Sequence, residues 1–288
     1  MHTSSFRDIL TLTRFPVSLA VTFSAFTAMV LASGELSAAM LWPVAGIFLL
    51  ASGASAFNQY QEWPYDELMA RTRRRPIPSR RISPAEGLRI ALIGIAGGLV
   101  ILMYESNWVC LSLGVINLIW YNGLYTWLKR KTAFAVVPGA LTGAIPILMG
   151  WSAMDGDLLA PQVLFLVFFI FIWQMPHFWM LTLKYGQEYR KAGFPVLNDL
   201  FGDIWIKVIV MTWLIASSGA SIMFVFFRMV QHPAIGYGML TINILTLLIV
   251  AYQLFLASSL RFRLIFISAN LFMLLVMIAL IADRMINS

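Results

Sequence analysis

Long apolar runs dominate this sequence and decide what the chain can fold into. Nine stretches of about 18 to 25 mostly apolar residues are each long enough to cross roughly 30 Å of hydrocarbon as a helix. They fall at 16–33, 38–60, 86–104, 107–128, 134–154, 160–183, 205–227, 234–257 and 262–282. We therefore expect an all-α integral membrane protein with nine transmembrane helices. Segment 16–33 has features of a signal peptide, but eight further spans favour an uncleaved first helix.

The composition agrees with a membrane protein. Hydrophobic residues make up 60% of the chain and charged residues only 11%, which lies far outside the range of soluble domains. A net charge of +7 would suggest nucleic acid as the partner of a soluble chain. In a membrane protein, basic loops are explained by the orientation of the chain, so we expect no nucleic-acid partner. The single cysteine, Cys110, excludes an internal disulfide and a thiolate metal site.

The distribution of basic residues predicts the orientation. If the N-terminus is cytoplasmic, 18 of the 20 Lys and Arg residues fall on the cytoplasmic side, and only Arg228 and Arg284 fall outside. This bias follows the positive-inside rule and supports both the nine-span count and a cytoplasmic N-terminus.

Topology does not explain the carboxylates in "NQYQEWPYDELMARTRRRP", which begins at Asn58. Asn58, Glu62 and Asp66 recur at intervals of four, so a continuous helix would place them on one face. Pro64 removes a backbone donor, and we expect the second span to end or kink near Glu62, with Asp66 brought in by the next turn.

Two interpretations of this stretch stay open on the residues alone. Carboxylate and amide oxygens suit Mg²⁺, and arginines suit phosphate oxygens, so the stretch predicts a metal–diphosphate site at the cytoplasmic face. The alternative is a solvated interfacial loop in which the acids pair with arginines.

Two more polar segments are expected on the same side. Lys184, Glu188 and Arg190 lie in the predicted loop after the sixth span, and Lys129 and Arg130 follow the fourth. The two acid-and-base loops are four spans apart, which suggests a duplicated four-helix unit. Three polar loops on one side can cap a single cavity.

At this point a family resemblance is clear. The motifs "NQYQEWPYDELMARTRRRP", "YTWLKRKT", "GALTGAIPILMGW", "WQMPHF" and "EYRKAGFPVL" resemble, in order and separation, those of the UbiA superfamily of intramembrane prenyltransferases, and within it the branch that farnesylates haem. The resemblance covers about residues 50 to 200. It implies one domain over residues 1–288, with nine helices around a central cavity in the bacterial inner membrane and active-site loops in the cytoplasm.

The resemblance also implies the chemistry. The family transfers the farnesyl group of farnesyl diphosphate to a vinyl group of haem b, which gives a hydroxyethylfarnesyl side chain and releases pyrophosphate, with Mg²⁺ as cofactor. The expected catalytic and metal-binding residues are Asn58, Glu62, Asp66 and Glu188. The expected diphosphate-binding residues are Arg71, Arg75, Lys129, Arg130, Lys184, Tyr189 and Arg190. Aromatic faces that could stabilise an allylic cation are those of Trp120, Tyr121, Tyr125 and Trp127.

The haem side is assigned to Gln174 and His177. His177 could ligate or hydrogen-bond haem, although a histidine in a membrane span is ordinarily just hydrogen-bonded. Asp199 and Asp203 could supplement the second metal-binding motif or cap the seventh helix. The implied partners are farnesyl diphosphate, haem b and the lipid bilayer, with haem A synthase or a terminal oxidase assembly as protein partners.

Two other functions are weighed against haem farnesylation. One is a UbiA-type prenyltransferase with another acceptor, such as an aromatic quinone precursor. The other is a transporter or structural membrane protein, which would have no reason to gather acids, arginines and "WQMPHF" on one side.

Overall fold

The computed structural model describes residues 5–287. Within these residues nine helical segments are long and apolar enough to cross a membrane, which confirms the expected number of spans. The helices that form them are α2 (Phe15–Ser33), α3 (Leu41–Asp66), α4 (Pro84–Glu105), α5 (Trp108–Leu118), α7 (Val136–Ala153), α8 (Pro161–Lys191), α9 (Asp203–Phe226), α10 (Pro233–Ala251) and α11 (Phe262–Ile286).

Shorter elements link and extend these helices. A seven-residue helix, α1 (Phe6–Leu12), precedes the first span, and α6 (Thr126–Leu128) completes the fourth. Wide-turned π-helical segments follow α5 at Ile119–Tyr125 and α10 at Tyr252–Leu256. Single 3₁₀ turns lie at Ala38–Met40, Ala133–Ala135 and Leu197–Asp199.

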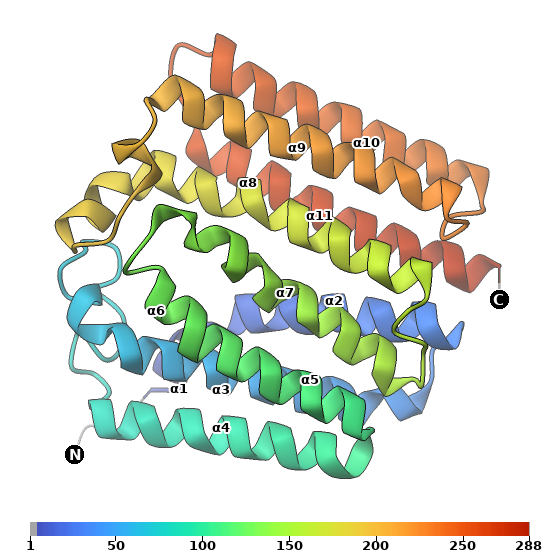
Figure 1. Ribbon diagram of the computed structural model, residues 1–288, viewed down its shortest axis with the longest axis horizontal. Helices are drawn as coiled ribbons and strands as arrows, with labels where there is room; N and C mark the ends of the chain where they lie inside the picture. The colour runs from blue at the N-terminus through green and yellow to red at the C-terminus, as the bar shows by residue number, and fades with distance from the viewer. Residues whose placement is uncertain (1–4, 288) are drawn as a thin grey trace.

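The spanning helices run side by side, with the N-terminus at one end of the bundle and the C-terminus at the other (Figure 1). An odd number of spans requires this arrangement. The connections 67–83, 129–132 and 192–202 gather at the end where the chain begins, on the left in Figure 1. We call this end of the bundle the polar end.

Small residues set how closely α3 and α4 approach. A Cβ on Gly53 would lie 2.8 Å from the carbonyl oxygen of Ala91, and a Cβ on Gly98 would lie 2.6 Å from the backbone nitrogen of Leu50. Only glycine leaves room for this contact, which is the usual role of small residues between membrane helices. The contact fixes α3, the helix that carries the first acidic motif.

The structure corrects two local expectations, namely an end of the second span near Glu62, which was one of two alternatives there, and a loop directly after the sixth span. Helix α3 does not end near Glu62 but continues through Pro64 to Asp66. Because Pro64 lies in the last turn, its missing N–H and its ring disturb only the end of the helix. Lys184, Glu188 and Arg190 are not in a loop, since α8 runs to Lys191. Basic residues in its last turn favour the helix C-terminus, and Gly193 follows at φ +78°.

Candidate active site

A cavity of about 730 Å³ opens inside the bundle, between α2, α3, α7, α8 and α11 and the π-helical segment after α5. Its volume lies within the range of small-molecule pockets. The body is mostly apolar, with lining side chains such as Val21, Ile47, Leu50, Met149 and Ile170. The cavity therefore offers an elongated apolar ligand a place among the helices.

Charged side chains line the cavity toward the polar end. They comprise four cations and two carboxylates, namely Arg14, Arg71, Arg75, Lys129, Glu62 and Asp66. The excess of positive charge in a low-dielectric setting favours an anion at this mouth. An apolar body with a cationic mouth suits an amphiphile whose head group is anionic.

The first acidic motif lies on one face of α3, as its spacing predicts. Asn58, Glu62 and Asp66 are 0%, 5% and 1% exposed. Such burial of carboxylates is costly unless each is paired and hydrogen-bonded. The solvated-loop interpretation is therefore wrong about solvation, although the pairing that it predicted is present.

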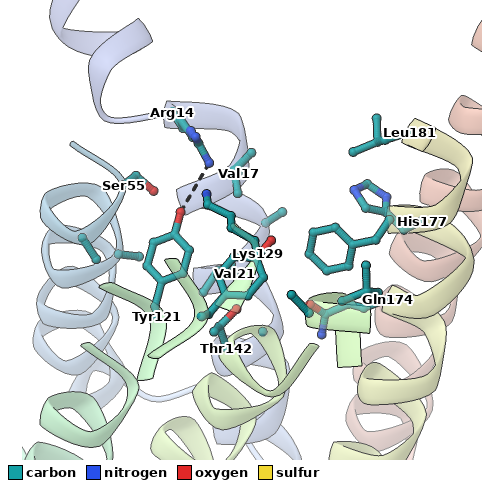
Figure 2. Close-up of a pocket in the computed structure, with 18 of the residues that line it drawn as sticks. Arg14, Val17, Val21, Ser55, Tyr121, Lys129, Thr142, Gln174, His177 and Leu181 are labelled. Atoms are coloured by element: carbon teal, nitrogen blue, oxygen red, sulfur yellow. Dashed lines mark hydrogen bonds between the residues drawn. The ribbon is translucent and has the colours of Figure 1, made fainter. Parts of the chain in front are cut away.

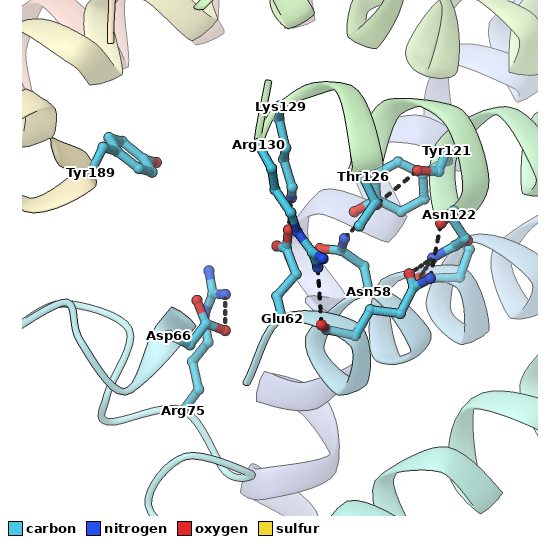
Figure 3. A network of polar contacts seen from close by, with 12 residues as sticks. Asn58, Glu62, Asp66, Arg75, Tyr121, Asn122, Thr126, Lys129, Arg130 and Tyr189 are labelled. Carbon is cyan, nitrogen blue, oxygen red and sulfur yellow. Dashed lines mark hydrogen bonds and ion pairs between the residues drawn. The ribbon is translucent and has the colours of Figure 1, made fainter. Parts of the chain in front are cut away.

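Each member of this face is held by one basic side chain from another element, and Figure 3 shows Lys129 beside Glu62 and Arg75 beside Asp66. The three contacts are Arg14 Nη2 donating to Asn58 Oδ1 over 3.1 Å, Lys129 paired with Glu62, and Arg75 Nη1 donating to Asp66 Oδ2 over 2.6 Å. Asn58 also donates to Thr126 Oγ1 over 3.0 Å. Arg14 is thus fixed from behind by a buried amide.

Burial and neighbouring charges shift the pKa values of Lys129, Arg75 and Arg14. Burial lowers the pKa of Lys129, and the opposing Glu62 carboxylate offsets only part of this effect. Burial, followed by the charge of Arg14, lowers the pKa of Arg75. Burial also acts to lower the pKa of Arg14, but Tyr121 and then Glu62 outweigh it, so this pKa is raised. An anion bound at the mouth would stabilise the charged forms of Lys129 and Arg75.

The buried carboxylates suit a hard cation, but they do not form a complete cage. Glu62 and Asp66 both line the cavity, and they offer the oxygen ligands that Mg²⁺ prefers. Among residues 5–287, no three His, Cys, Asp or Glu side chains gather closely enough to hold an ion alone. Mg²⁺ ordinarily takes one or two carboxylates and completes its shell with water and substrate phosphate. The donor set therefore fits Mg²⁺ bound together with a diphosphate.

Two of the residues predicted to bind the metal, Asn58 and Glu188, lie away from the cavity surface. Neither is among the residues that line the cavity. The Asn58 oxygen accepts from Arg14, and Glu188 Oε2 accepts from the backbone N–H of Arg71 over 3.1 Å. Both residues therefore lie behind the mouth, where they contact Arg14 and Arg71, whereas Glu62 and Asp66 line the cavity itself.

The motif "EYRKAGFPVL", which begins near the end of α8, contacts the connection 67–83. Tyr189 lines the cavity, and its hydroxyl accepts from Arg71 Nη2 over 3.2 Å. The Phe194 ring lies 5.5 Å from the Tyr65 ring. Together with the Glu188 contact, these interactions place Arg71 at the mouth.

Three basic residues expected to bind diphosphate lie outside the lining. Lys184 stacks over the rings of Tyr185 and Phe262 at 5.2 and 4.7 Å. Arg190 donates through Nε to Asp199 over 2.7 Å. Arg130 Nη2 donates to the carbonyl of Gln61 over 3.1 Å, and its guanidinium lies 4.6 Å from the Tyr65 ring. All three side chains therefore contact neighbouring protein groups.

Asp199 and Asp203 were expected either to supplement the metal site or to cap the seventh helix. Asp199 pairs with Arg190. Asp203 begins α9 and accepts from Asn198 Nδ2 over 3.1 Å. Neither lines the cavity, which favours a structural role at the start of α9.

Arg14 is a mouth residue that sequence reasoning missed. It lies before the first span, in a left-handed conformation with φ +47°, and this turns its side chain back into the bundle. Its Nη1 donates to the Tyr121 hydroxyl over 3.3 Å (Figure 2). A basic residue just before an apolar run is explained by the positive-inside rule alone. Only the contact with Asn58 in the folded protein shows that Arg14 belongs to the mouth.

The π-helical segment after α5 supplies the aromatic wall. Tyr121 and Tyr125 both line the cavity and stack with ring centroids 6.0 Å apart, and Lys129 lies 5.3 Å from the Tyr125 ring. Trp120 instead donates to the carbonyl of Pro138, and Trp127 is 55% exposed. Of the four aromatic candidates, the two tyrosines face the cavity.

The wall opposite the tyrosines carries the residues assigned to the haem side (Figure 2). Gln174 Nε2 donates to the carbonyl of Ala140 over 2.9 Å. A Cβ on Gly143 would lie 2.5 Å from Gln174 Oε1, so the glycine motif of α7 makes room for this side chain. The ring of His177 lies 4.8 Å from that of Phe266. Both predicted residues thus line the cavity.

The fold and site define a multi-pass membrane protein that takes an amphiphile, with its anionic head at a buried, carboxylate-bearing cationic mouth and its apolar part among the helices. The model of the UbiA prenyltransferase family matches residues 21–276. The chain belongs to this family, and it is a prenyltransferase.

Individual relatives extend this result. The chain is 31% identical over 275 residues to "Protoheme IX farnesyltransferase" of Oleidesulfovibrio alaskensis, covering 96% of this chain and 95% of the relative. It is 35% identical over 224 residues to the protein of the same name from Marinobacter nauticus, covering 77% and 74%.

Solved structures share the fold. A UbiA homologue from Aeropyrum pernix K1 matches with a TM-score of 0.71 and 19% identity, covering 93% of this chain and 98% of that one. A UbiA homologue from Archaeoglobus fulgidus, bound to GPP and Mg²⁺, matches with a TM-score of 0.70 and 13% identity, covering 95% and 99%.

Proposed function

We propose that the protein transfers the farnesyl group of farnesyl diphosphate to a vinyl group of haem b and releases pyrophosphate. The observation that carries this proposal is the cationic mouth with two buried carboxylates beside a mostly apolar cavity of about 730 Å³. The acceptor is supported by relatives named protoheme IX farnesyltransferase, one of which matches 96% of this chain.

In this proposal, the residues around the mouth fall into three groups: those that bind Mg²⁺, those that contact the diphosphate and those that position other side chains. Glu62 and Asp66 would hold Mg²⁺ when the diphosphate is bound, and Asn58 and Glu188 keep Arg14 and Arg71 in position at the mouth. The side chains that contact the diphosphate are Arg14, Arg71, Arg75, Lys129 and Tyr189, all of which line the cavity. Arg130, Lys184 and Arg190 hold the surrounding segments in place.

Bond breaking then follows from the charges at the mouth. As the allylic C–O bond opens, negative charge grows on the diphosphate, and the fixed arginines and Lys129 stabilise it without reorganisation. Bound Mg²⁺ would supply further charge stabilisation of the leaving group. Tyr121 and Tyr125 present aromatic faces to the allylic cation. The apolar walls keep bulk water away from the cation.

We further propose that the polar end faces the cytoplasm of a bacterial inner membrane. The bias of 18 out of 20 basic residues toward that side supports this orientation. Farnesylated haem is strongly apolar, so it would pass within the bilayer to a haem A synthase or a terminal oxidase assembly.

The test is expression in cells that make haem b and lack another haem farnesyltransferase, followed by mass analysis of extracted haems. Wild type should give farnesylated haem, and Asp66→Asn should abolish it. Glu67→Gln is the matched control, because Glu67 is the next residue but is exposed and does not line the cavity. Unmodified haem b beside abundant, folded wild-type protein would refute the acceptor, and a prenylated quinone precursor would identify the alternative one.

A further inference from the structure

The proposed reaction consumes a water molecule, which the mouth residues do not account for. When the terminal vinyl carbon bonds to the first farnesyl carbon, the breaking C–O bond leaves its electron pair on the diphosphate. The positive charge passes to the vinyl carbon next to the porphyrin. The hydroxyl of the hydroxyethylfarnesyl side chain forms when water donates an oxygen electron pair to that carbon and then loses a proton. The enzyme must therefore admit one water to an apolar cavity and provide an acceptor for its proton.

Two polar side chains in the haem-side wall, His177 and Asn270, can bind a water molecule and accept its proton. His177 on α8 and Asn270 on α11 both line the cavity, and their side chains are hydrogen-bonding neighbours. Their surroundings are largely aromatic, with the rings of Trp173 and Phe266 at 5.4 and 4.8 Å from that of His177. The pair is thus a small polar site in an otherwise apolar part of the lining.

The hydrogen bonds of Asn270 define which nitrogen of His177 is free. Asn270 Nδ2 donates to the carbonyl of Phe266 over 2.5 Å, and the Asn270 oxygen can accept from a ring N–H of His177. Nδ1 of His177 is buried and has no hydrogen-bond partner within residues 5–287, so we assign the ring proton to Nε2. A neutral imidazole then keeps a lone pair on Nδ1.

A buried ring nitrogen without a partner costs free energy unless it binds water or a ligand. His177 lies 14 residues before the end of α8 at Lys191. Figure 2 shows it facing Tyr121 across the cavity.

We propose that His177, positioned by Asn270, binds the water whose oxygen becomes the product hydroxyl and accepts its proton at Nδ1. This inference rests on the proposed haem farnesylation. A chain that prenylates an aromatic ring would need no such water, because the ring is restored by loss of its own proton.

The test compares His177→Gln and Asn270→Leu with wild type in the haem-extraction assay, and follows pyrophosphate release. His232→Gln is the matched histidine control, because His232 lies in the connection between α9 and α10 and does not line the cavity. Without the base, we expect hydroxylated product to fall about 100-fold in His177→Gln. The cation should instead lose a proton from carbon, giving farnesylated haem lighter by one water. Asn270→Leu should shift the ratio of the two products in the same direction.

The outcomes separate the possibilities. In water enriched in heavy oxygen, the wild-type hydroxyl should carry the label. An unchanged ratio of hydroxylated to dehydrated product in both variants overturns the proposal, whatever the total yield. Loss of the absorption signature of bound haem in His177→Gln would make the histidine an iron ligand and also overturn it. Absence of any farnesylated haem from wild type would instead refute the proposed function.

Discussion

Arg75 Nη1 donates a hydrogen bond to Asp66 Oδ2 over 2.6 Å, and the two side chains are 18% and 2% exposed. This contact ties the connection 67–83 back onto the last turn of α3. Thr72 Oγ1 adds a second tie by donating to the backbone carbonyl of Asp66 over 3.0 Å. The same carboxylate that is proposed to hold Mg²⁺ therefore organises the mouth before any substrate binds.

Removing one partner of this pair should destabilise the protein. Asp66→Asn leaves the Arg75 charge buried and uncompensated, and we expect a loss of about 3 kcal/mol in the free energy of unfolding in detergent. Asp66→Asn with Arg75→Gln should cost less than the sum of the single changes. The matched control is the Asp8–Arg81 pair, with an N–O distance of 2.8 Å but an arginine that is 46% exposed, whose coupling should stay below about 1 kcal/mol. Equal coupling in the two pairs would contradict this account.

Arg14 should contribute to diphosphate affinity. Arg14→Gln removes a charged donor that lines the mouth, so we expect KM for farnesyl diphosphate to rise about tenfold, as the loss of one charge-assisted hydrogen bond implies. Arg7→Gln is the control, because Arg7 is exposed and does not line the cavity. A KM unchanged in Arg14→Gln, with folding intact, would remove Arg14 from the site.

The sequence was sufficient to predict the helices and the first acidic face, because apolar length and four-residue spacing are local properties. It was insufficient for Arg14, Asn270 and the true place of Glu188, because these depend on contacts between distant segments. A basic residue beside an apolar run predicts orientation equally well whether it faces solvent or turns inward. The resemblance pointed to motifs whose residues the fold gathers around the cavity, but it could not separate side chains that line the cavity from those that hold the lining in place.

Gly143 should matter for the acceptor more than for the donor. A Cβ there would press on Gln174, so Gly143→Ala should lower the yield of farnesylated haem while KM for farnesyl diphosphate changes less than twofold. In Gly219→Ala the new Cβ would meet no atom within 4 Å. That control should keep full activity and gain up to about 1 kcal/mol in stability from helix propensity. Equal effects of the two substitutions on haem yield would show that Gly143 has no special relation to the site.

Metal binding should depend on the diphosphate, because Glu62 and Asp66 alone leave the shell of Mg²⁺ incomplete. We expect Mg²⁺ alone, or pyrophosphate alone, to raise the unfolding temperature little, and the two together to raise it clearly, since only a ligand bound to the folded state adds stability. Chelation should abolish farnesyl transfer, and added Mg²⁺ should restore it. Glu62→Gln should lose the joint stabilisation, and Glu86→Gln should keep it, because Glu86 lies in the first turn of α4 and does not line the cavity. A large shift by Mg²⁺ alone would instead reveal a complete protein cage for the ion and refute the shared site.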